Sequence, residues 1–315
     1  MPAEAVLLIA FGGPTAPDEV RPFLANVLRG RPVPPERVEE VARHYEAIGG
    51  ASPLTALTLR QADALRALLE REGPRLPVYV GMRNWHPYLR DTLAVMQRDG
   101  VRHALGVILA AQQSDASWDR YQRDVAEARA ALNGVAPEIE FAPSWHAHPL
   151  FIEAVADRVG RALDSMAADR RISVRVVFTA HSIPTAMAAT APYEAQLREG
   201  AALVMAALQA VLARQGAPLL EHTLAYQSRS GNPRDPWLGP DIADVVRAEA
   251  ARGARDLLVV PLGFVCDHVE VLYDLDVEAR QVADALGVGF IRVPAVNNHP
   301  SFIRMLAAVI GAHAR

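Results

Sequence analysis

Short apolar runs alternate along the chain with longer segments of helical periodicity. The apolar runs predict eight strands, and the segments between them repeat apolar residues every three to four positions, as amphipathic helices do. The predicted strands cover residues 6–11, 78–82, 105–110, 139–142, 174–180, 223–227, 257–262 and 289–293. Strands that alternate with helices in this way form parallel sheets with helices on both faces.

The pattern restarts near residue 145, with four predicted strands on each side. We therefore predict an α/β fold of two similar halves, each a four-stranded parallel sheet flanked by helices. The N-terminal half is expected over residues 1–145, and the C-terminal half over 146–315, closed by the C-terminal helix. Open sheets of this type bind ligands beyond the carboxyl ends of their strands. The cleft between two such halves is the expected active site.

Acidic residues follow the predicted strand 257–262. Glu270, Asp274 and Glu278 recur every four residues after His268. In an α-helix this spacing places the three acids on one face, with a rise of about 6 Å per step. Such carboxylates are ligands for a hard divalent cation, although acids early in a helix also stabilise its dipole by about 0.3–1 kcal/mol each. We expect a weakly held, hydrated cation here.

A histidine follows the predicted strand 174–180, in the sequence His181-Ser182-Ile183-Pro184. A side chain at this end of a parallel strand projects into the crevice where ligands bind. With an ordinary pKa near 6.5, a histidine can be a metal ligand or a proton acceptor. The alternative is a histidine bonded only to loop backbone. Because Glu270 follows a neighbouring strand of the same half, we expect His181 and Glu270 to meet.

The N-terminal half carries aromatic and carboxylate-binding residues after its first two strands. Arg29 suits bidentate capture of a carboxylate, and Tyr45 and Ser52 offer neutral hydrogen bonds. A simpler explanation of Ser52 is a helix N-cap followed by Pro53. Trp85 adds a flat aromatic face. Together with metal ligands in the other half, these residues predict a flat, apolar, carboxylate-bearing ligand that receives a metal ion. That description fits a porphyrin.

Composition excludes several other chemistries. All 32 basic residues are arginine, so a P-loop lysine, a Schiff base and pyridoxal phosphate are excluded. The net charge of −4 gives no reason to expect nucleic acid or an anionic membrane as partner. The single cysteine, Cys266, cannot supply the four thiolates of an iron–sulfur cluster.

The chain starts with a strand-like run in place of a signal peptide and has no apolar run of about 20 residues. We therefore expect a cytoplasmic protein.

Several long motifs resemble those of the ferrochelatase family. They are VFTAHSIP at residues 177–184, VPLGFVCDHVEVLYDLD at 260–276, and the stretches 226–231 and 236–240, with support from 44–54 and 79–87. The resemblance covers nearly the whole chain. Within the family, the chain is most similar to the soluble coproporphyrin ferrochelatases of Gram-positive-type bacteria. It implies two Rossmann-like, chelatase-type halves. It also implies a lyase of haem biosynthesis that inserts Fe²⁺ into a porphyrin, with coproporphyrin III as the favoured substrate.

The resemblance also implies roles for individual residues. His181 and Glu270 would face the porphyrin centre as metal ligands and proton acceptors. Asp274 and Glu278 would form an outer cation site, either an entry route for iron or a Mg²⁺ site. The residues that would contact the porphyrin or its propionates are Phe11, Arg29, His44, Tyr45, Ser52, Trp85 and Tyr121.

The chain departs from the family pattern at two places. Phe11 stands where several soluble members carry a tyrosine that can approach the iron, and phenylalanine cannot bind a metal. Residues 111–113 replace an aromatic-rich turn of many relatives. The chain ends at Arg315 without the extension that membrane-associated or cluster-bearing members use.

We expect Fe²⁺ as substrate, no permanently bound cofactor, a monomer, and transient contact with neighbouring enzymes of the haem pathway.

Four alternatives stay open at this point. The chain could act on protoporphyrin IX, or it could be a relative that acts on sirohydrochlorin or inserts cobalt. It could also be a porphyrin or haem carrier without catalytic activity. A two-lobed solute-binding module would share the architecture, but such modules normally carry a signal peptide.

Overall fold

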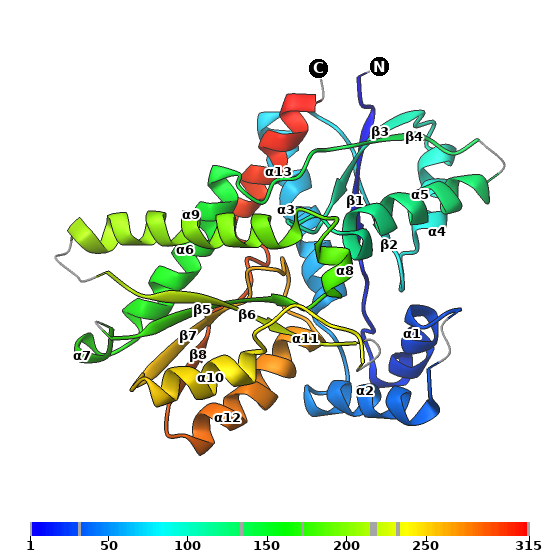
Figure 1. Ribbon diagram of the computed structural model, residues 1–315. Coiled ribbons are helices and arrows are strands. Elements are labelled where there is room, and N and C mark those ends of the chain that lie inside the picture. Colours follow the sequence, from blue (N-terminus) through cyan, green and yellow to red (C-terminus); the bar gives the residue numbers. More distant parts are fainter. Residues whose placement is uncertain are drawn as a thin grey trace. The chain divides into compact units, whose positions relative to one another are not determined.

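The computed structural model describes residues 2–30, 33–132, 135–171, 173–214, 219–230 and 234–313 (Figure 1). The chain forms two compact units. The first contains Met1–Ala110, Asp115–Ser144 and Asn297–Arg315, and the second contains Ala111–Ser114 and Trp145–Val296. Each unit is built on one four-stranded parallel sheet flanked by helices, which confirms the predicted fold class.

The sheet of the first unit has the strand order β2-β1-β3-β4. Its strands are β1 (Ala5–Ala10), β2 (Val78–Met82), β3 (His103–Ile108) and β4 (Glu138–Phe141). All six residues of β1 are buried, as expected of a central strand covered on both faces. Strand β3 begins two residues earlier than the predicted strand 105–110, because its first residues pair with β4.

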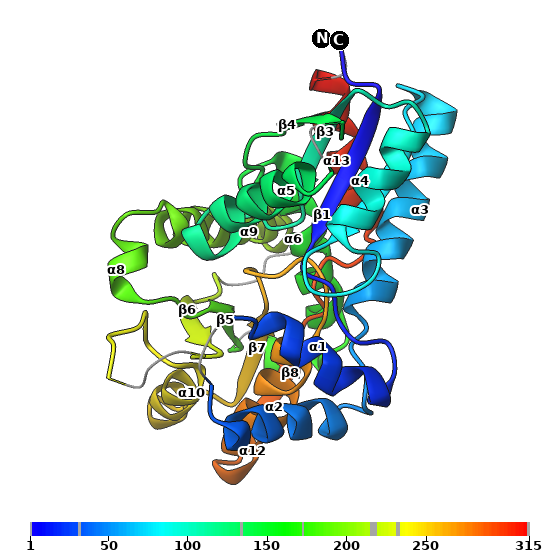
Figure 2. The same ribbon diagram turned by 90° about the vertical axis from the view of Figure 1, so that its right-hand side faces the viewer.

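Helices cover both faces of this sheet (Figure 1). One face carries α4 (Leu89–Arg98) and α5 (Arg120–Ala130), which share a buried apolar cluster with β1. The other carries α3 (Leu54–Glu72), which packs on α13 (Pro300–His313). Two further helices, α1 (Val20–Val27) and α2 (Pro35–Ala47), lie side by side (Figure 2).

The C-terminal helix corrects one expectation. The sequence pattern placed it with the second half, but α13 belongs to the first unit and packs along α3. Its buried residues include Phe302, Met305 and Leu306, so the apolar stripe of α13 is covered by this contact. Periodicity predicts that a helix has an apolar face, but it does not say which sheet that face covers.

The second sheet has the strand order β6-β5-β7-β8, which repeats the order of the first. Its strands are β5 (Arg175–His181), β6 (His222–Gln227), β7 (Asp256–Val260) and β8 (Gly289–Arg292). The chain leaves β5 to form β6 on one side and then crosses to form β7 on the other. The boundary between β5 and β7 is therefore a topological switch point, where a crevice opens at the carboxyl ends of the strands.

The helices of the second unit also cover both faces of the sheet (Figure 1). On one side are α6 (Pro149–Asp164) and α9 (Tyr193–Arg214), and on the other are α10 (Ile242–Ala251) and α12 (Arg280–Ala285). Short elements complete the unit: α7 (Ala168–Arg171), α8 (Thr185–Ala188), α11 (Val269–Leu272) and a π-helix, η3 (Asp274–Ala279). No described helix is long and apolar enough to cross a membrane.

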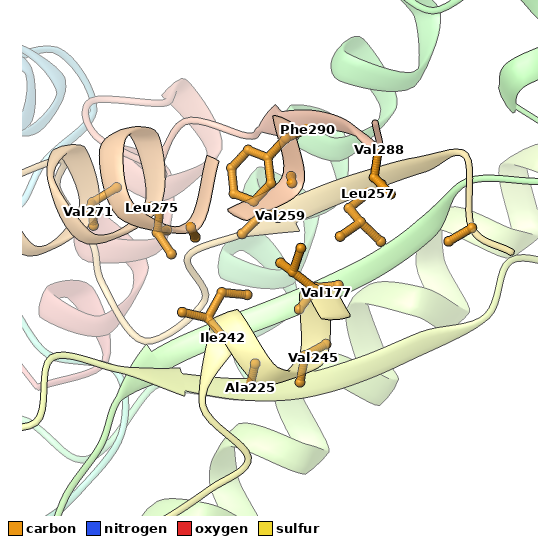
Figure 3. Packing of buried hydrophobic residues seen from close by; sticks show 14 residues of the cluster. Val177, Ala225, Ile242, Val245, Leu257, Val259, Val271, Leu275, Val288 and Phe290 are labelled. Carbon is orange, nitrogen blue, oxygen red and sulfur yellow. The ribbon is translucent and has the colours of Figure 1, made fainter. Parts of the chain in front are cut away.

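A buried apolar cluster joins the second sheet to residues 267–278, called the acidic segment below because they include Glu270, Asp274 and Glu278 (Figure 3). Val177 and Val259 come from the two central strands, and Val271 and Leu275 come from α11 and η3. Both Val271 and Leu275 are fully buried. Burying such a side chain contributes about 1.5–3 kcal/mol, so this cluster fixes the acidic segment to the sheet.

Gly263 lies where the chain leaves β7 and passes close to the end of β5. Its N–H donates to the Thr179 carbonyl oxygen at 3.0 Å. A Cβ at this position would lie 2.6 Å from the Cβ and 2.8 Å from the Cα of Ala180. Because Ala180 is a fully buried strand residue, the chain has space only for glycine here.

We predict that Gly263→Ala lowers the free energy of unfolding by about 1–3 kcal/mol, because the added methyl group overpacks this contact. Urea denaturation followed by circular dichroism measures the change. Gly160→Ala in α6 is the matched control, since nothing beyond the local helix backbone lies within 4 Å of the position that its methyl group would take. That helical substitution should be neutral or stabilise by up to about 1 kcal/mol. Equal stability of Gly263→Ala and the unsubstituted protein would contradict the packing argument.

Candidate active site

His181 and Glu270 lie close together at the carboxyl ends of adjacent strands. His181 is the last residue of β5, and Glu270 lies in α11, which follows β7. Because β5 and β7 pair in parallel, their ends lie at the same edge of the sheet. His181 Nε2 lies 3.8 Å from Glu270 Oε1. This gap is too long for a hydrogen bond, but one metal ion with bonds of about 2.1 Å to each atom can bridge it.

The backbone around His181 fixes the direction of its ring. Nδ1 contacts the carbonyl oxygen of Ser182, and a carbonyl can only accept, so Nδ1 carries the proton. Nε2 is then left with a lone pair on the side of Glu270. The Tyr193 hydroxyl donates to the His181 carbonyl oxygen at 3.0 Å, and the Ser182 hydroxyl donates to that of Leu238 at 2.7 Å. These bonds hold the strand end in place.

A second histidine, His268, lies on the other side of the Glu270 carboxylate. Its Nε2 is 3.3 Å from Glu270 Oε2, and its Nδ1 is 3.1 Å from the Cys266 carbonyl oxygen. Burial raises the pKa of Glu270, but His181 and His268, when they are protonated, outweigh burial and lower it to about 2. Burial lowers the pKa of His268, but Glu270 outweighs this and raises it. Glu270 is therefore an anion at neutral pH.

Two residues at the end of β6 contact the acidic segment. The Gln227 side-chain amide donates to the Glu270 carbonyl oxygen, and the Ser228 hydroxyl donates to Asp274 Oδ2. Gln227 is buried, and Ser228 has a left-handed backbone with φ +64°. That conformation costs a non-glycine residue on the order of 1–3 kcal/mol, and here it directs the hydroxyl at Asp274.

Asp274 and Glu278 line a small cavity beside this contact. The cavity has a volume of about 230 Å³, and its lining includes Ser228 and Asp241. Burial, followed by the negative charge of Glu270, raises the pKa of Asp274 to about 7, although the Ser228 hydrogen bond acts in the opposite direction. Near neutral pH, Asp274 therefore exchanges between its neutral and charged forms.

The acidic segment does not form the single α-helix that its four-residue spacing suggests. Four residues of α11 are followed by the π-helix η3, in which the Glu278 N–H donates to the Tyr273 carbonyl oxygen. Glu270 therefore faces the histidines, Asp274 faces Ser228, and Glu278 is exposed. Among the described residues, no three His, Cys, Asp or Glu side chains are placed to hold one metal ion together. The His181–Glu270 pair is thus an open, two-donor arrangement.

Three of the aromatic residues singled out in the first half pack around a fourth, Phe23. Its ring centroid lies 6.3 Å from that of Phe11 and 6.1 Å from those of Tyr45 and Trp85, all edge to face. Tyr45 and Trp85 are buried, and Trp85 Nε1 donates to Glu19 at 3.0 Å. Phe23 was assigned no role from the sequence, because helix α1 was not predicted.

The remaining residues of the first half lie in different surroundings. Arg29 is exposed after α1, where it donates to Asn26 at 2.7 Å, and burial lowers the pKa of His44 on α2. Ser52 accepts the N–H of Leu54 at 3.3 Å, but the N-cap of α3 is Pro53, so the predicted N-cap at Ser52 lies one residue too early. Tyr121 is buried in the apolar cluster under α4 and α5. Their contact with a ligand stays a prediction.

Sequence reasoning noted His268 before the acids, and Gln227 and Ser228 within a family motif, but it named none of them as a site residue. Gln227 ends a predicted strand next to the one that ends in His181, so its strand-end position was an available signal. Gly231, the last residue of the same motif, and the next two residues, Asn232 and Pro233, lie outside the described residues. Ser228 offered no such signal, because a serine in the sequence does not indicate a left-handed backbone.

Comparisons with known proteins agree with this architecture. The ferrochelatase family model matches residues 3–314. The coproporphyrin III ferrochelatase of Nocardia farcinica is 43% identical over 99% of this chain and 89% of its own length. That of Mycolicibacterium smegmatis is 42% identical over 98% and 89%. The sirohydrochlorin chelatase of Bacillus subtilis subspecies spizizenii, solved with cobalt, is similar in fold, with a TM-score of 0.55, 11% identity and coverage of 99% and 95%.

The raised pKa of Asp274 predicts a pH-dependent effect of Asp274→Asn on stability. The unfolded chain releases this proton near pH 3.9 and the folded protein near pH 7, so the folded state binds more protons in between. Stability then falls as pH rises through this range, and asparagine abolishes the effect. Relative to the unsubstituted protein, Asp274→Asn should gain about 1–3 kcal/mol between pH 5 and pH 8.5.

Urea denaturation at the two pH values, in the presence of a chelator, measures this gain. Chelation matters because a bound cation would lower the pKa of Asp274. Asp244→Asn on α10 is the control, since Asp244 is exposed and its removal should change stability by less than about 0.5 kcal/mol. A gain for Asp274→Asn that is the same at both pH values would show that Asp274 does not bind its proton more tightly in the folded state.

Proposed function

Because the chain belongs to the ferrochelatase family, we propose that it inserts Fe²⁺ into coproporphyrin III, with His181 and Glu270 as metal ligands and proton acceptors. The observation that carries this proposal is the strand-end pair, whose Nε2 and Oε1 atoms are 3.8 Å apart. The names of the relatives support coproporphyrin III as the substrate. The pair lies beyond the carboxyl ends of β5 and β7, where sheets of this type bind ligands.

The reaction requires Fe²⁺ to lose bound water and the porphyrin to lose two N–H protons. A neutral imidazole and one carboxylate bind a divalent cation but leave most of its coordination positions open. Open positions allow the metal to pass to the four pyrrole nitrogens. A full set of protein ligands would hold the metal too tightly for this transfer, and among the described residues no three His, Cys, Asp or Glu side chains are placed to hold one metal ion together.

The proton chemistry falls mainly to His181. Glu270, with a pKa of about 2, is the weaker proton acceptor of the pair, whereas the lone pair on His181 Nε2 accepts a pyrrole proton once the metal has passed to the porphyrin. The neighbouring carboxylate then stabilises the imidazolium that forms. His268 has a raised pKa and donates toward Glu270, so it orients that carboxylate. Two protons leave for each Fe²⁺ that enters, so His181 accepts them one at a time and releases each to water.

The other residues singled out have supporting parts in this proposal. Asp274 and Glu278, which line the 230 Å³ cavity, provide an outer site for a hydrated cation, either iron on its way in or Mg²⁺. In this proposal Arg29, whose side chain is exposed, binds a propionate. Phe11, His44, Tyr45, Ser52, Trp85 and Tyr121 supply the porphyrin-binding side of the first unit. The reaction needs no resident cofactor and no iron–sulfur cluster.

The test is anaerobic insertion of Fe²⁺ into coproporphyrin III and protoporphyrin IX, followed by absorbance. The unsubstituted protein should convert coproporphyrin III faster. His181→Ala should lower kcat by about 10²–10⁴-fold while coproporphyrin binding, measured by fluorescence quenching, is retained. His222→Ala is the matched control, because His222 begins β6 and lies exposed at the opposite end of the same sheet. It should retain full activity.

Each other outcome points to a different conclusion. Faster conversion of protoporphyrin IX would keep the reaction and reverse the substrate. Binding of both porphyrins without metal insertion would identify a carrier. Near-native turnover by His181→Ala would remove His181 from the chemistry.

A further inference from the structure

Arg292, the last residue of β8, bridges two aspartates of the acidic segment. Its Nε donates to both carboxylate oxygens of Asp276, at 3.0 and 2.9 Å, and its Nη1 donates to Asp267 Oδ1 at 2.9 Å. The side chain is only 13% exposed. Planar guanidinium groups suit such multiple contacts, because their donors have fixed directions.

The two aspartates lie on either side of the groups that form the candidate site. Asp267 precedes Glu270 by three residues, and Asp276 follows Asp274 by two. Asp267 Oδ1 also accepts the N–H of Ala295 at 3.1 Å, so the bridge is tied to the chain that follows β8. Arg292 therefore fixes both ends of the segment to one edge strand of the sheet.

The bridge also balances charge. Residues 267–278 contain five acids, and only three of them belong to the candidate site. Asp267 and Asp276 are 14% and 26% exposed, so leaving them unpaired would be costly. Arg280 is the other cation near Asp276, but it is 3.7 Å away and more exposed. Without Arg292, two further carboxylates would compete for the same cation and repel Glu270.

We propose that Arg292 is a positioning residue for metal insertion: by bridging Asp267 and Asp276 it fixes the position of Glu270 and prevents two neighbouring carboxylates from binding Fe²⁺. The inference rests on the proposed function. Arg292 itself touches neither metal nor porphyrin. Its effect is expected on the metal-dependent constants and not on those of the porphyrin.

The test compares Arg292→Gln and Arg292→Lys with the unsubstituted protein. Arg292→Gln should raise the KM for Fe²⁺ and the Kd from anaerobic Fe²⁺ titration by about 10–100-fold, as loss of groups that orient metal ligands does, with the coproporphyrin Kd unchanged. Arg292→Lys should give intermediate values, because lysine keeps the charge but cannot donate to both aspartates in the same geometry.

Arg170→Gln is the matched control for loss of a buried ion pair. Arg170 donates to both oxygens of Asp256, which is 2% exposed at the start of β7, far along the strand from the site. This variant should lower Tm, but it should leave the KM and Kd for Fe²⁺ unchanged. If both glutamine variants have a lower Tm but only Arg292→Gln has a raised KM and Kd for Fe²⁺, the loss of stability cannot explain the weaker Fe²⁺ binding.

An unchanged KM and Kd for Fe²⁺ in Arg292→Gln would overturn the inference, as would equal changes in Arg170→Gln. If the unsubstituted protein bound Fe²⁺ without inserting it, the proposed function would fail. The Fe²⁺ titration would still decide whether Arg292 positions the metal-binding pair, so the two failures are distinguishable.

Discussion

The parallel pairing of β5 with β7 determines where the groups of the candidate site lie. Phe178 pairs with Val260, so His181 and Gly263 leave the sheet at the same level. Gly263 lies against Ala180, and this close approach brings the chain that follows β7 alongside the end of β5. Within seven residues it has turned enough for Glu270 to face His181, with His268 on the other side of the Glu270 carboxylate. A side chain at position 263 would push these two segments apart.

Charge balance is the second feature that makes this arrangement stable. Glu270 stays ionised between two histidines, Asp274 is partly neutral near pH 7, and Arg292 compensates Asp267 and Asp276. The segment therefore carries one fixed anion where the metal would bind. Its other acids are paired, protonated or exposed. In the proposed mechanism, the same separation would let one carboxylate act as ligand while the neighbouring imidazole accepts protons.

The sequence was sufficient to predict all eight strands, because buried parallel strands are continuous apolar runs bounded by turns. It also predicted the meeting of His181 and Glu270, since adjacent parallel strands end at the same edge. The π-helix η3 was not predictable, because a four-residue spacing of acids is also the spacing of an ordinary helix. For the same reason Asp274 was not expected to face Ser228.

Other features depend on tertiary packing that local patterns do not contain. The apolar stripe of α13 would suit either sheet, and only the structure places it on α3. The contacts that matter for Phe23, Gln227 and Arg292 are made with residues distant in the sequence. Arg292 in particular looks like an ordinary strand-end arginine until its two aspartates are brought beside it.

The most direct measurement of the His181–Glu270 pair is a double-mutant cycle on kcat/KM for Fe²⁺ with His181→Ala, Glu270→Gln and the combined variant. If the two side chains bind one metal ion and act as a unit, the combined variant should be about as slow as the slower single variant. If the two losses multiply, the residues act independently, and a shared metal site at the ends of β5 and β7 would be contradicted.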